Sequence, residues 1–127
     1  MVLRMWRARS TASGAADYVQ HATTKVFPKI RAIEGHRGEY LLRREVEDGT
    51  ELVVLTLWES MEAVRRFAGP DPDKAVVEPG AQAGLTSFDD YVTHFEVVDG
   101  MADSQIPEAE FQRKSSSYLD RKQESAR

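Results

Sequence analysis

Three kinds of side chain in this sequence are suited to acid–base or anion chemistry. His94 is the best candidate for a general base, because an imidazole with an unperturbed pKa of about 6.5 exchanges protons near neutral pH. Arg4 and Arg44 could hold an anionic oxygen, and Tyr40 could donate a hydrogen bond to a ligand. These residue types suit a reaction that ionises its substrate and then stabilises the negative charge.

Each of these assignments has a structural alternative. His94 could form a hydrogen bond with Glu96 or with a backbone group instead of acting on a ligand. Arg4 and Arg44 could belong to ion pairs between subunits. The sequence alone leaves both kinds of role open.

Metal and redox chemistry have little support in the sequence. The chain has three histidines and no cysteine, and no H-x-E-x-H type of spacing occurs. The lack of cysteine also excludes a disulfide framework and a thiol nucleophile. We therefore expect neither a metal nor a cofactor.

The composition is that of an ordinary globular protein, with 41% hydrophobic and 30% charged residues in 127. A net charge of −4 argues against a nucleic-acid binder, which would usually carry a basic face. The first ten residues contain three arginines and no long apolar run, so we expect no signal peptide, no membrane anchor and a cytoplasmic location.

The most continuous apolar stretch lies at 51–60, ELVVLTLWES, and predicts a central strand with apolar residues on both faces. The Asp-Gly pair within 47–50 is typical of a tight hairpin, so a strand at 36–47 should be its antiparallel neighbour. Two further strands are predicted at 2–8, from alternation, and at 91–98.

Helical spacing begins at Ala15 and runs to Val26, and Pro28 should end or kink this helix. Ser13 is one of several possible N-caps for it. Ser60 caps a second predicted helix, MEAVRRFA at 61–68. Two further segments are predicted after it: a helical turn that begins at Asp71-Pro72, and a loop over 79–90.

We expect one domain over 1–98 and a polar C-terminal tail over 99–127. The tail contains a few large side chains that could anchor it to a partner: Ile106, Phe111, Tyr118 and Leu119.

The predicted order is strand, helix, strand, strand, helix, strand. This order indicates an α+β, ferredoxin-like βαββαβ fold, with a four-stranded antiparallel sheet and both helices on one face. The other face would then carry apolar residues such as Val54 and Trp58. Two copies that pack these faces together would form a homodimer and close a barrel.

Several motifs resemble those of the antibiotic-biosynthesis-monooxygenase-like proteins of the dimeric α+β barrel superfamily. They are the opening MVLRMWR, the arginine-rich second strand, the Trp-Glu-Ser of Trp58 to Ser60 before a helix with Phe67, and the closing YVTHFEVV. The resemblance spans roughly residues 1–98. It implies a dimeric α+β barrel that holds a small hydrophobic or aromatic ligand in its cavity.

The haem-degrading branch of these proteins has an asparagine, a tryptophan and an iron-ligating histidine, at positions where this chain has Trp6, Phe67 and Val77. The resemblance therefore does not imply haem degradation for this chain.

The cofactor-independent branch oxidises anthrone-type polyketides with O2. Trp58 matches that pattern.

Three other positions depart from the cofactor-independent pattern. Val54, Val64 and Glu78 stand where it has asparagine, tyrosine and arginine. A related chemistry would then depend on other residues of this chain.

By the same resemblance, the cavity-lining face carries Trp6, Val54 and Trp58, with Arg4 and Thr56 of matching parity. Trp6 and Trp58 could equally be core or interface anchors, because buried aromatic rings dominate such packing. On the last strand the bulkier set, which includes Thr93 and Phe95, suits the helix side and leaves His94 toward the cavity. The candidate site is therefore made of two groups: catalytic His94, Trp58 and Arg44, and substrate-binding Trp6, Arg4, Tyr40, Val54 and Thr56.

The leading functional hypothesis is a cofactor-independent monooxygenase that acts on an aromatic or polyketide-like small molecule. The alternative is a non-catalytic or stress-related dimer that binds a hydrophobic ligand in the same cavity. A third hypothesis is a structural dimer whose C-terminal tail recruits a partner.

Overall fold

The computed structural model describes residues 1–101, and Met1–Val97 forms one compact unit. The tail anchors predicted beyond residue 101 lie outside the described part. The elements are β1 (Val2–Ser10), α1 (Ala12–His21), a π-helical segment η1 (Ala22–Val26), α2 (Phe27–Arg31), β2 (His36–Val46), β3 (Gly49–Trp58), α3 (Met61–Ala68), α4 (Pro79–Gln82), β4 (Ser87–Phe88) and β5 (Thr93–Glu96).

The strands form one antiparallel sheet in the order β2-β3-β1-β4, and β5 also pairs with β1. This order confirms the predicted α+β, ferredoxin-like fold. The predicted last strand is shorter than expected and is preceded by a two-residue strand. Both short strands lie along the outer edge of β1, β5 beside Val2–Met5 and β4 beside Ala8 and Arg9.

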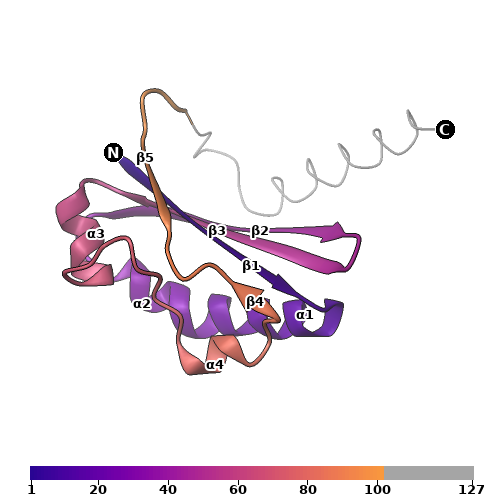
Figure 1. Ribbon diagram of the computed structural model, residues 1–127. Helices are drawn as coiled ribbons and strands as arrows, with labels where there is room; N and C mark the ends of the chain where they lie inside the picture. The colour runs from indigo at the N-terminus through magenta and orange to yellow at the C-terminus, as the bar shows by residue number, and fades with distance from the viewer. Residues whose placement is uncertain (102–127) are drawn as a thin grey trace. The chain divides into compact units, whose positions relative to one another are not determined.

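One face of the sheet is covered by helices, with α1 and α2 running beneath it in Figure 1. Successive side chains of a strand point to opposite faces, so one parity of each strand is buried. In β1 the buried set includes Arg4 and Trp6, and in β3 it includes Leu52 and Trp58. The core therefore lies between this face and the helices.

The opposite parity forms a face that no element of residues 1–97 covers, here called the open face. The strand register places on it Leu3, Met5, Tyr40, Leu42, Val53, Leu55, Leu57 and Phe95. Tyr40, Leu42 and Phe95 are each close to half exposed. The open face is thus apolar, as expected, although its residues differ from the predicted ones.

The prediction that the Val54 and Trp58 side chains lie on the face of the sheet away from the helices was wrong. Both lie on the helix-covered face, and the Trp58 side chain is fully buried. Phe95 was expected on the helix side but pairs with Leu3 on the open face. Because both faces of β3 are apolar, hydrophobic pattern alone could not assign its parity.

The first helical region continues further than predicted. Pro28 lies inside α2, and the chain before it widens into η1, where the Phe27 N–H donates to the Ala22 carbonyl five residues earlier. Proline cannot donate a backbone hydrogen bond and crowds the preceding turn, so a local π-helical widening is a physical way to pass it. The N-cap of α1 is Thr11 rather than Ser13, because the Thr11 Oγ1 accepts from the Gly14 N–H at 3.0 Å.

The hairpin and the second helix are as predicted. Gly49 has φ of 144°, which suits glycine in the tight connection between β2 and β3. Ser60 caps α3 by accepting from the Ala63 N–H at 3.2 Å. The helical turn predicted from Asp71 is absent; the backbone there is a turn, and Lys74 forms a bridge with Tyr91. A short helix, α4, occupies part of the predicted loop.

Replacing the observed cap of α1 should cost more stability than replacing its neighbour. Thr11→Ala should lower the free energy of unfolding by about 1 kcal/mol, because it leaves a helix N–H without its acceptor. Ser13→Ala should change it much less, since within residues 1–101 the Ser13 hydroxyl has one hydrogen-bond partner, the Thr11 hydroxyl at 3.4 Å. Urea unfolding of both variants measures the difference, and equal losses would contradict this capping assignment.

Candidate functional site

A cavity of about 70 Å³ lies between the helix-covered face of the sheet and the helices. By volume it has room for about two water molecules, at about 30 Å³ each, so an aromatic ligand needs the cavity to widen on binding. Its walls are mainly apolar. The lining residues are Arg4, Trp6, Tyr18, Val26, Phe27, Ile30, Val54, Thr56, Phe67, Val76, Val77, Glu78, Ala81 and Val92. The cavity therefore lies within one chain, whereas the sequence placed it between two sheets of a dimer.

Arg4 provides a buried cation to this cavity and is only 4% exposed. Its Nη1 donates to the Pro72 carbonyl and lies 3.0 Å from His94 Nε2, and its Nη2 donates to the Lys74 carbonyl at 3.0 Å. The guanidinium carbon lies 5.5 Å from the centre of the Phe67 ring. Burial lowers the pKa of Arg4 to about 10, which still leaves it protonated at neutral pH.

His94 links Arg4 to a carboxylate. Its Nδ1 lies 3.1 Å from Asp73 Oδ1, on the side of the ring away from Arg4. Because an arginine only donates, Nε2 must be the acceptor, and Nδ1–H then donates to Asp73. Burial, and next the positive charge of Arg4, lower the pKa of His94, while Asp73 opposes the shift. The neutral ring therefore has both nitrogens engaged within the protein.

Aromatic side chains form much of the cavity wall. The Trp6 ring lies 5.8 Å from the Tyr18 ring, and its Nε1 donates to the Asp89 carbonyl at 2.9 Å. Burial raises the pKa of Tyr18 to about 12, so its hydroxyl stays protonated and can donate. Tyr18 was not among the predicted site residues. The sequence feature that could have identified Tyr18 is its position on the apolar side of the first helix, next to Val19.

Trp58 lies beside the cavity rather than in its wall. Its ring stacks on Phe67 with 5.6 Å between centroids, and its Nε1 donates to Thr56 Oγ1 at 2.8 Å. Thr56 and Val54 do line the cavity. Trp58 thus packs against residues that line the cavity without lining it itself. This position corresponds to the alternative interpretation, in which Trp58 is a core anchor.

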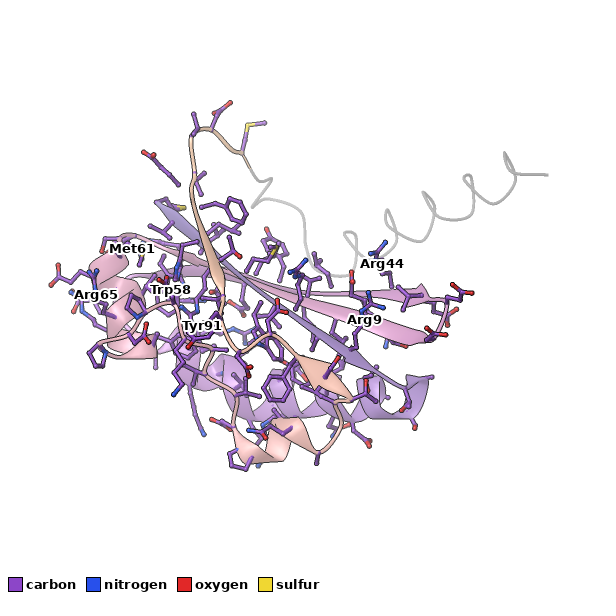
Figure 2. All side chains as sticks on the ribbon, in the orientation of Figure 1. Arg9, Arg44, Trp58, Met61, Arg65 and Tyr91 are labelled. Carbon is purple, nitrogen blue, oxygen red and sulfur yellow. The ribbon has the colours of Figure 1, made fainter. Side chains whose placement is uncertain are left out.

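Arg44 and Tyr40 do not join the other predicted residues. Both are on β2 and on the open face, opposite Glu51 and Leu55. The Glu51 carboxylate lies 2.9 Å from Arg44 and 3.3 Å from Arg9. Figure 2 shows Arg9 and Arg44 close together toward the hairpin, far along the sheet from Trp58. Arg44 is therefore an ion-pair member of the open face.

Besides Arg4, the cavity wall contains one other charged residue among the lining residues, Glu78. No role was predicted for Glu78 from the sequence. Its carboxylate lies 3.3 Å from Lys29 Nζ and 3.4 Å from His21 Nε2. This contact ties the segment before α4 to the first helical region. Within residues 1–101 no cluster of three or more metal-ligating side chains occurs, and none of the helices there could span a membrane.

Acid should destabilise the wild-type protein more than a His94→Gln variant. The pKa of folded His94 is lowered, whereas an unfolded histidine keeps a pKa of about 6.5. As pH falls from about 6.5 toward the lower folded pKa, the unfolded chain binds a proton that the folded chain does not, so the free energy of unfolding decreases. Glutamine accepts a hydrogen bond without titrating. Urea unfolding at a series of pH values tests this, and equal acid losses would contradict it.

The family model for antibiotic biosynthesis monooxygenase matches residues 1–79. No curated protein matches the chain. Among solved structures, the monooxygenase ActVA-Orf6 of Streptomyces coelicolor, in complex with nanaomycin D, is 19% identical over 81% of this chain and 92% of its own, with a TM-score of 0.53. SnoaB, a cofactor-independent oxygenase of Streptomyces nogalater, is 19% identical over 80% and 97%, with a TM-score of 0.51.

A variant of MhuD from Mycobacterium tuberculosis, with manganese protoporphyrin IX bound, is 25% identical over 81% of this chain and 100% of its own, with a TM-score of 0.55. The similarity to these structures supports the fold, and the family model covers more than half of the sequence. The predicted resemblance is therefore confirmed: the chain belongs to the antibiotic biosynthesis monooxygenase family.

Proposed function

We propose that the protein is a cofactor-independent monooxygenase that oxidises an aromatic or polyketide-like small molecule in the cavity beneath β1 and β3. The observation that carries the proposal is an apolar, aromatic-walled cavity that lies within one chain of this family. Two structural neighbours, SnoaB and ActVA-Orf6, are an oxygenase and a monooxygenase. Trp6, Val54 and Thr56 are the proposed substrate contacts.

The reaction needs no cofactor if the substrate supplies all the electrons. The substrate loses two hydrogens, one from an electron-rich ring carbon and one from its hydroxyl group. One oxygen atom of O2 becomes the carbonyl oxygen of that carbon, and the other leaves as water with the two hydrogens. For 1-naphthol the products are 1,4-naphthoquinone and water, so atoms balance. A dry pocket favours this chemistry because it shields the substrate anion and reactive intermediates from water.

Oxygen uptake with 1-naphthol tests the proposal. The wild type should consume O2 above the uncatalysed rate, and with ¹⁸O2 the quinone should gain one labelled oxygen. Val54→Phe should reduce the rate at least about tenfold, because the larger ring occupies the cavity. Val53→Phe is the matched control, since Val53 points to the open face and adds the same volume outside the cavity. No uptake by the wild type, or equal rates in both variants, would argue against the proposed activity.

A second candidate function is the binding of a hydrophobic ligand without catalysis. The observation in its favour is that Trp58, the one residue matching the cofactor-independent pattern, is fully buried and donates its N–H to Thr56. Binding of naphthol to the wild type, blocked by Val54→Phe and accompanied by no oxygen uptake, would favour this function over the first.

We also propose that the protein is a homodimer assembled through the open face. Monomeric proteins rarely expose a large contiguous apolar patch, and a second copy offers a self-complementary surface to cover it. Tyr40, Leu42 and Phe95 are each at least 45% exposed there. The Arg9–Glu51–Arg44 ion cluster lies on the same face, nearer the hairpin, and would form a polar border.

A charge at the centre of the open face should separate the two copies. Leu55→Glu should convert a dimer to a folded monomer, because the interface would bury an unpaired carboxylate. Gln20→Glu adds the same charge on an exposed position of α1 and should leave the dimer intact. Analytical ultracentrifugation reports the mass and circular dichroism the fold. A wild-type monomer, or a dimer that survives Leu55→Glu, would refute this interface.

A further inference from the structure

Arg4 is a buried cation without a carboxylate partner. Among residues 1–101, no aspartate or glutamate oxygen lies within ion-pair distance of its guanidinium. Its acceptors are two backbone carbonyls and one neutral imidazole nitrogen, and the charge of the Asp73 carboxylate, beyond ion-pair distance, offsets its burial only in part, since the pKa of Arg4 is still lowered to about 10. A buried charge is costly when it is not paired, so this arrangement calls for a compensating anion.

Two donors of the guanidinium remain available. Arginine has five N–H groups, and the three hydrogen bonds to Pro72, Lys74 and His94 use three of them. The N–H of Nε and one N–H of Nη2 have no acceptor within the described residues. These nitrogens are adjacent, so together they can bind both oxygens of a carboxylate or a single oxyanion. Arg4 lines the cavity, where such an anion would lie, and the other charged group in the wall, the Glu78 carboxylate, is paired with Lys29.

His94 and Asp73 determine which donors stay available. His94 Nε2 occupies one Nη1 donor at 3.0 Å, and Asp73 fixes the required tautomer by accepting from Nδ1 at 3.1 Å. The charged or titratable groups against His94 are Arg4 on β1 and Asp73 on the segment before α4, with Glu96 two residues on in β5. With both ring nitrogens engaged, His94 orients Arg4 instead of removing a substrate proton.

We propose that the cavity selects ligands that carry an anionic oxygen on an aromatic body, with Arg4 as the anion-binding residue and His94 and Asp73 as its positioning residues. The inference rests on the proposed function, because it names the ligand class of the same cavity. Trp6, Phe67 and Val54 supply the apolar walls for the ring. A carboxylate and a phenolate share the chemistry that Arg4 recognises.

Binding of matched charged and neutral ligands tests this selectivity. Benzoate and benzamide have nearly the same size and shape but differ in charge. By calorimetry the wild type should bind benzoate at least about tenfold more tightly than benzamide, because charge-assisted hydrogen bonds form only with the anion. 4-Nitrophenol ionises near neutral pH, so its phenolate and phenol forms can be compared while Arg4 keeps its charge, and this comparison separates the two oxyanion sources. Equal affinity for benzoate and benzamide would overturn the proposal.

Variants separate anion recognition from a structural role. Arg4→Met should abolish the preference for benzoate while keeping benzamide binding. Asp73→Ala, at a side chain that is 68% exposed, should weaken benzoate binding several-fold and leave benzamide binding unchanged. His94→Gln should keep the preference, because glutamine accepts from Arg4, and His94→Leu should reduce it. Parallel losses for both ligands in Asp73→Ala and His94→Leu would show a merely structural role and overturn the positioning assignment.

The binding result is independent of catalysis. Charge selectivity without oxygen uptake would support the anion site and reject the monooxygenase. Oxygen uptake from 1-naphthol with no benzoate preference, and no effect of Arg4→Met on binding, would support the enzyme and reject the anion site.

Discussion

The charge of Arg4 beneath the sheet is the constraint on which the site depends. A guanidinium that is 4% exposed must be held by acceptors from several parts of the chain. The segment after α3 supplies two carbonyls, and β5 supplies His94. These contacts draw the region between α3 and β5 against β1. They also hold the guanidinium in the cavity wall.

The two faces of the sheet carry different groups of residues. The helix-covered face places aromatic walls and the buried cation around one cavity, while the open face carries aliphatic residues and the Arg9–Glu51–Arg44 ion cluster. Strand alternation links the faces, because residues adjacent in β3 point in opposite directions. Assembly through one face and ligand binding at the other could therefore be altered separately, as Val53 and Val54 illustrate.

The element order, the hairpin and the Ser60 cap were predictable from sequence because they rest on local signals: alternation, a turn glycine and a capping hydroxyl. The sequence did not predict which side chains of β3 point toward the helices, because leucine, valine and tryptophan make both faces of this strand apolar. Strand alternation placed Arg4, Trp6, Val54 and Thr56 on one face, and they line one cavity there, on the other side of the sheet from the predicted dimer cavity; their roles in binding stay a prediction. The contact of His94 with Asp73 depends on a turn predicted as helical, so no local pattern indicated it.

The most direct test of this account observes Arg4 itself. Nuclear magnetic resonance of ¹⁵N-labelled protein can follow the Nε–H of Arg4, assigned by its loss in Arg4→Lys. We expect a downfield shift of this proton when benzoate is added, because it gains a charged acceptor, and little change with benzamide. An unmoved Arg4 signal, with benzoate shifting arginines of the open face instead, would contradict an anion-binding cavity beneath the sheet.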